Sequence, residues 1–71
     1  MSFQIYYVHL LNSEVITIDE DYDLPFEKGL IANFKKAKAE DIIVLKRPLL
    51  GNLYVPKRSI DYISEGDVRV V

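Results

Sequence analysis

Apolar and polar residues alternate along the first twenty residues in the way that two paired β-strands require. Residues 3–10 are rich in aromatic and β-branched side chains, and alternation makes both faces of this segment substantially apolar. We therefore expect a strand that is central in its sheet or covered on both sides. Asn12-Ser13 fits a hairpin turn, and residues 14–19 return as a second apolar strand. The sequence predicts that these two strands pair in antiparallel fashion.

A helical spacing replaces this alternation in the next segment. Phe26, Leu30 and Phe34 recur every four residues and form one apolar stripe. The proline before Phe26 suits the first turn of a helix, and Asp23 is a candidate cap. Three lysines lie near the end, where cations interact favourably with the helix dipole. The pattern predicts one helix over residues 25–38.

Short apolar runs separated by proline and glycine return in the second half of the chain. They predict strands over residues 41–46, 53–55 and 59–63, a turn at 65–67 and a further edge strand over 68–71. The order is strand, strand, helix, then strands. We expect an α+β fold: a small antiparallel sheet of five to six strands, strongly bent or barrel-like, with one helix (β-β-α-β-β-β).

Length and composition add limits to this fold. Seventy-one residues predict a single domain over residues 1–71, and 49% of them are hydrophobic, unlike a disordered chain. The absence of cysteine favours a cytoplasmic location, since secreted domains of this size usually carry disulfides. We expect neither a signal peptide nor a membrane segment. Residues 1–34 carry a net charge of −5 and residues 35–71 one of +3.

The candidate motifs for chemistry fail at identifiable positions. The acidic segment 19–23 begins like a calcium loop, but the sixth and twelfth positions, which need Gly and Glu, hold Leu24 and Leu30. His9 is the single histidine, and without cysteine only a serine could act with it as a nucleophile. We therefore expect no metal, no cofactor, no catalytic residue and no small-molecule substrate, and the chain is interpreted as a non-enzymatic protein.

Two Lys-Arg pairs flank one predicted connection and form the strongest candidate for a binding site. Cations hold phosphates and exposed rings stack on bases, which is how single-stranded nucleic acid is bound. Leu49 and Leu50 at the tip of the same connection would form an apolar protein contact if exposed, and part of the core if turned inward. The candidate nucleic-acid-binding residues are Lys46, Arg47, Tyr54, Lys57 and Arg58.

Residues 9–16 and 53–63 resemble the first hairpin and the closing strands of Sm-like RNA-binding barrels, or more loosely of SH3-like barrels. The resemblance implies a small barrel. The Sm-like helix precedes the first strand, however, whereas here a helix is predicted after the second. Ser13 stands where that family usually has glycine, and its Asp-x-x-x-Asn motif has no match. No binding residue is carried over. The chain also resembles small proteins of Gram-positive bacteria and their phages.

Three functions follow from these observations. The first is a small protein-interaction or regulatory module, which could self-associate through an exposed edge strand. The second is a nucleic-acid-binding barrel that uses the basic residues of segment 46–58. The third is a structural component of a larger assembly such as a phage particle. The sequence favours the first, with a protein or a second copy of the chain as its partner.

Overall fold

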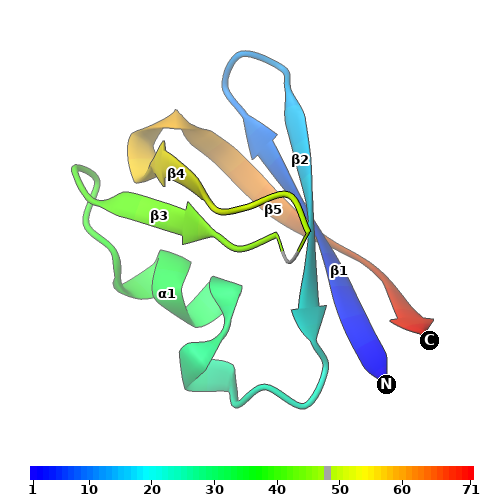
Figure 1. The fold of residues 1–71 in the computed structure, drawn as a ribbon. Helices are drawn as coiled ribbons and strands as arrows, with labels where there is room; N and C mark the ends of the chain where they lie inside the picture. The colour runs from blue at the N-terminus through cyan, green and yellow to red at the C-terminus, as the bar shows by residue number, and fades with distance from the viewer. Residues whose placement is uncertain (48) are drawn as a thin grey trace.

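A computed structural model of the chain, described here for residues 1–47 and 49–71, contains two antiparallel sheets and one α-helix (Figure 1). The first sheet has the strand order β2-β1-β5, and the second consists of β3 and β4. Short 3₁₀ turns, η1 and η2, precede α1 and β5. The elements are β1 (Ser2–Leu10), β2 (Val15–Asp21), η1 (Phe26–Lys28), α1 (Leu30–Lys36), β3 (Ile42–Leu45), β4 (Leu53–Pro56), η2 (Lys57–Ser59) and β5 (Ile60–Val70).

The predicted first hairpin is confirmed, and β1 is the central strand of its sheet. Within the hairpin loop Ser13, with φ of 74°, adopts the left-handed conformation. The Asn12 side chain accepts a hydrogen bond from the Glu14 N–H at 3.0 Å, an Asx turn that stabilises the bend. Val8, on the inner face of β1, is completely buried. β1 is therefore central in its sheet, with one buried face and a second face that is half-buried or exposed.

The last segment is one long strand, β5, so the predicted turn at residues 65–67 and the separate strand over 68–71 are wrong. The pairing of β5 with β1 shifts register between Gln4 and Tyr6 of β1. The Gln4 side chain donates a hydrogen bond to the Gly66 carbonyl at 2.8 Å there. A Cβ on Gly66 would lie 2.6 Å from the Tyr7 ring. The glycine that indicated a turn instead lets an aromatic ring pack against an irregular strand.

The predicted helix over residues 25–38 is shorter and interrupted, because η1 ends at Lys28 and α1 begins at Leu30. The helix start is not capped by Asp23. The Glu20 carboxylate of β2 instead accepts the Leu30 N–H at 2.7 Å. Gly29 permits this approach, since a Cβ there would lie 3.0 Å from a Glu20 carboxylate oxygen. A strand residue ten positions earlier therefore sets where the helix begins.

The expectation of one strongly bent or barrel-like sheet of five to six strands is corrected, because five strands form two sheets that do not close into a barrel. Strands β2 and β3 do not pair with each other. Leu30 and Asn33 of α1 line a cavity together with Ile18 of β2 and Val44 of β3. A cavity, and not a ladder of paired strands, therefore lies between β2 and β3 beside the helix. The buried core lies between the sheets and α1 and consists of Tyr6, Val8, Ile18, Leu30, Ala32, Ile43, Leu45 and Ile60.

Candidate interaction surface

The hairpin of β3 and β4 has one buried and one exposed face. Ile43 and Leu45 point into the core, where Leu45 is completely buried. The alternate residues Ile42 and Val44 are 54% and 41% exposed, and Tyr54, which lies opposite Val44 in the register, is 67% exposed. Three large apolar side chains therefore share the solvent-facing side of this two-stranded sheet, where polar residues are usual.

The tip of this hairpin exposes two adjacent leucines. Leu49 is 96% exposed and Leu50 is 74% exposed, so neither belongs to the core. The turn is held by hydrogen bonds from the Leu50 and Gly51 N–H groups to the Arg47 carbonyl, at 3.2 and 3.0 Å. Gly51 has a φ of 84°, a conformation that glycine adopts without strain. Pro48, which belongs to the predicted connection, lies outside the described residues.

The five residues predicted to bind nucleic acid do not form one surface. Lys46 follows the exposed face of β3 and lies on the same side as Tyr54. Arg47 turns away and, together with Leu49 and Leu50 of the hairpin tip, lines a cavity against Thr17 and Arg69 of the other sheet; its Nε donates to the Gly51 carbonyl at 3.3 Å. Arg58 is exposed in η2.

Lys57 has a structural position in the described chain. Its ammonium group donates a hydrogen bond to the Ala37 carbonyl at the end of α1, at 2.6 Å. The same group lies 4.7 Å from the centre of the Phe34 ring, a cation–π contact. Its charge therefore satisfies the negative end of α1 and connects the helix to the start of η2. Of the predicted set, Lys46 and Tyr54 are the pair that the fold brings to one face.

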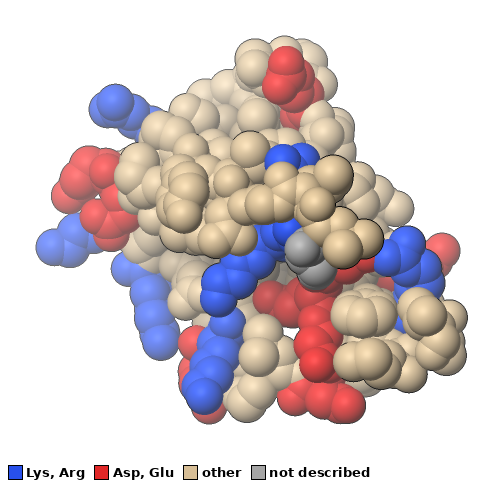
Figure 2. Space-filling view, viewed as in Figure 1, with Lys and Arg blue, Asp and Glu red and all other residues tan. Residues whose placement is uncertain are grey.

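A groove that no sequence pattern indicates runs between α1 and β3. It has a volume of about 630 Å³ and is lined by Lys36 and Ala37 of the helix and by Ile42, Val44 and Lys46 of the strand side. In Figure 2, Lys and Arg side chains gather over α1 and β3, beside a band of Asp and Glu side chains near the end of β2. The groove is therefore apolar along β3 and basic at its rims.

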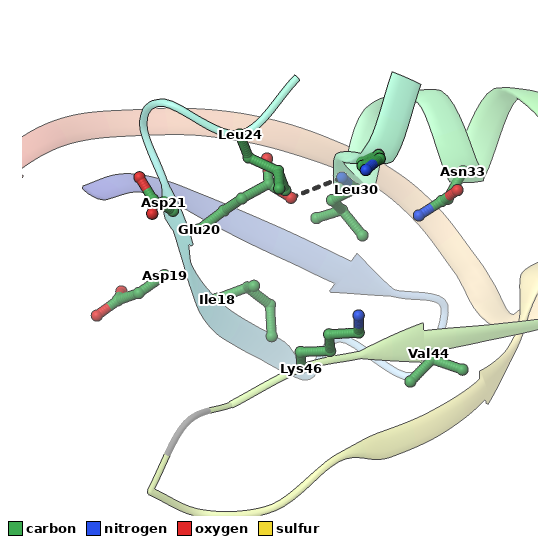
Figure 3. Close-up of a pocket in the computed structure, with 10 residues that line it drawn as sticks. Ile18, Asp19, Glu20, Asp21, Leu24, Leu30, Asn33, Val44 and Lys46 are labelled. Atoms are coloured by element: carbon green, nitrogen blue, oxygen red, sulfur yellow. Dashed lines mark hydrogen bonds between the residues drawn. The ribbon is translucent and has the colours of Figure 1, made fainter. Parts of the chain in front are cut away.

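A smaller cavity of about 250 Å³ continues this groove towards β2. Asn33, Val44 and Lys46 line both spaces. Figure 3 shows the Lys46 ammonium group and the Asn33 amide pointing into the smaller cavity from opposite walls. Glu20 lies on the third side, where its carboxylate is held by the Leu30 N–H. The two spaces together extend along β3 beyond the ends of the strand.

A second polar cluster lies on the opposite face of the β2-β1-β5 sheet. The His9 Nε2 lies 2.9 Å from the Ser64 hydroxyl oxygen, in hydrogen-bond contact, and the His9 ring stacks on Tyr62 with 4.0 Å between centroids. Sequence spacing could not reveal this contact, because it depends on the β1–β5 register. In the described chain no carboxylate hydrogen-bonds to His9 to orient the ring. The pair therefore lacks the third group that activates a serine nucleophile.

The acidic residues at the end of β2 have individual structural contacts. Asp19 forms an ion pair with Arg69 across β1, and Glu20 caps α1. The Asp21 carboxylate accepts the Asp23 N–H at 2.9 Å. Among residues 1–47 and 49–71, no three His, Asp or Glu side chains are grouped as metal ligands. The segment that resembled a calcium loop thus forms the end of a strand and a turn.

The comparisons with other proteins give no further assignment. No protein-family model, no curated protein and no solved structure matched this chain. None of the helices in the described residues is long and apolar enough to cross a bilayer. The candidate site therefore depends on geometry alone, and the β3–β4 hairpin with its groove is the surface where apolar exposure, free charge and a cavity coincide.

Proposed function

We propose that this chain is a small, non-enzymatic protein-interaction module whose contact surface is the β3–β4 hairpin. One observation carries the proposal: a single hairpin exposes five large apolar side chains, three on its outer face and two at its tip, where they border the other sheet. Exposed apolar surface of this density is typical of a protein contact, since water is a poor solvent for it. The five residues are Ile42, Val44, Leu49, Leu50 and Tyr54.

The distribution of the basic residues favours a protein partner over nucleic acid. Nucleic-acid binding needs several free cations within reach of successive phosphates. Lys57 is bound to the end of α1, and Arg47 points to the other sheet. Of the predicted set, Lys46 shares a face with Tyr54 and Arg58 is exposed on η2, so these five residues supply two free cations and not a continuous phosphate-binding track. A nucleic-acid partner is nevertheless one outcome that the experiment below distinguishes.

The experiment compares tagged wild-type protein with Leu49→Ser/Leu50→Ser in nuclease-treated and untreated lysates of the source cell. The matched control is Leu11→Ser, because Leu11 is 66% exposed at the tip of the other hairpin. We expect a partner that survives nuclease, binds wild type and the control equally, and is lost from the double variant. Light scattering on the same proteins shows whether that partner is a second copy. Binding that nuclease abolishes, or that the two leucines do not affect, would contradict the proposal.

A further inference from the structure

Strand β3 has one free edge, and the register identifies which backbone groups it presents. The Lys57 N–H donates to the Asp41 carbonyl at 2.9 Å, so this pair is hydrogen-bonded across the hairpin. Bonding alternates along an antiparallel ladder. Ile42 and Val44 are therefore the residues whose N–H and C=O groups point away from β4. Pro56, which has no N–H, lies opposite Ile42 as this alternation requires.

The free edge of β3 lacks the charges or the proline that protect the other edge strands β2, β4 and β5, where the proline is Pro56 of β4. Charged residues in a strand discourage the addition of further strands. Strand β2 carries Asp19, Glu20 and Asp21, and β5 carries four charged residues along its length. Strand β3 consists of Ile42, Ile43, Val44 and Leu45, with no charge. It pairs with β4 alone in the described chain, and its other edge lies on the side of α1 (Figure 1). The groove lies between this strand and the helix.

The charges around this groove determine which chain it accepts. Lys36 and Lys46 line it from opposite walls, and neither forms an ion pair within the described residues. Asp41 also lines it, but its carboxylate accepts the Lys38 N–H at 2.9 Å. Lys35 and Lys38 extend the positive charge along the end of the helix. The lining of the groove itself therefore carries two lysines against one aspartate, which favours an acidic segment there, whereas the adjoining smaller cavity is lined by Asp19, Glu20 and Asp21.

We propose that an extended, acidic peptide segment of a partner protein binds in this groove and adds as a strand to the free edge of β3. Its backbone would pair with the N–H and C=O groups of Ile42 and Val44. Its acidic side chains, at alternate positions, would meet Lys36 and Lys46. A second copy fits less well, because it would bring its own Lys36 and Lys46 to the same groove. The inference rests on the proposed function, since it names the partner of the same hairpin.

The test uses a fluorescein-labelled octapeptide of alternating Glu and Val, with binding measured by anisotropy and amide chemical shifts. Two comparison peptides isolate the two interactions: one has Lys in place of Glu, and one has N-methylated amides at alternate positions. We expect the Glu-Val peptide alone to bind, with the largest shifts and slowed amide exchange at Ile42 and Val44. Equal binding of the N-methylated peptide, or shifts confined to another surface, would show that strand addition does not occur.

Charge variants give a second readout without altering β3. Lys36→Glu/Lys46→Glu should weaken binding of the Glu-Val peptide about tenfold or more, since one exposed pair is worth up to about fivefold. Lys35→Glu/Lys38→Glu is the matched control, because those residues do not line the groove, and it should have a smaller effect. An equal loss in both variants would overturn the inference in favour of nonspecific attraction. If the peptide does not bind but Leu49→Ser/Leu50→Ser still loses the partner, strand addition is rejected and the proposed function stands. If the peptide binds but the double leucine variant keeps the partner, the proposed function alone is rejected.

Discussion

The hydrogen bond from the Leu30 N–H to Glu20 predicts that this strand residue controls the stability of the helix. At 2.7 Å it is short, partly buried and charge-assisted. A hydrogen bond to a charged group contributes roughly 1.5–3 kcal/mol, and loss of a helix cap usually costs about 0.5–2 kcal/mol. Because the two estimates describe one contact, we expect Glu20→Ala to lower the free energy of unfolding by about 1.5–2 kcal/mol.

This loss is large for a domain of 71 residues, whose total stability should be roughly 4–10 kcal/mol. It corresponds to a fall in Tm of about 6–16 °C. Urea and thermal unfolding followed by circular dichroism would measure it. Glu27→Ala is the matched control, because Glu27 is an exposed acid near the same helix start. A difference between the two variants below about 0.5 kcal/mol would refute the reasoning, since surface substitutions reach that value.

Three further changes have defined outcomes. Leu45→Ala removes a completely buried side chain and should lower the free energy of unfolding by about 2–5 kcal/mol in urea unfolding, about half of the stability of the domain. Lys57→Met should lower stability by about 1–2 kcal/mol while Arg58→Met does not, which separates helix stabilisation from a binding role. Burial, then Glu20 and Glu65, raise the pKa of Tyr6 above 10.0. The unfolded phenol then ionises first, so unfolding free energy falls above about pH 10. In Tyr6→Phe the unfolding free energy should fall less above about pH 10 than in the wild type. An equal fall in both proteins would contradict the raised pKa of Tyr6.

The local features of the fold could be predicted from the sequence, and its closure could not. Alternation and a turn identified the first hairpin, and the apolar run of residues 42–45 identified β3. The helix boundary was wrong because Glu20, which is distant in sequence, caps Leu30. The split into two sheets depends on how β2, β3 and α1 pack against one another, and no periodicity in residues 25–38 encodes that. Gly66 indicated a turn because its local pattern is the same whether it bends the chain or accommodates Tyr7.

The candidate site was predicted in part. The sequence singled out segment 46–58 and left open whether Leu49 and Leu50 are exposed or part of the core. Both are exposed. The sequence did not separate Lys46, which faces the groove, from Lys57, which binds the end of α1. Both lysines follow strands and have the same local context, so only tertiary contacts distinguish them. The free edge of β3 could not be predicted either, because an edge is defined by the pairing that the other strands do not make.

The central position of β1 has a consequence for the order in which the molecule is completed. Its second partner is β5, and the pair of Ser2 with Val70 joins residues 68 positions apart. At a synthesis rate of about 5–20 residues per second, β1 waits several seconds on the ribosome for this partner. During that interval one edge of an aromatic, β-branched strand lies open. The final residues of β5 thus end the period in which the nascent chain is most exposed to misassembly, and contacts of such long range favour slow folding.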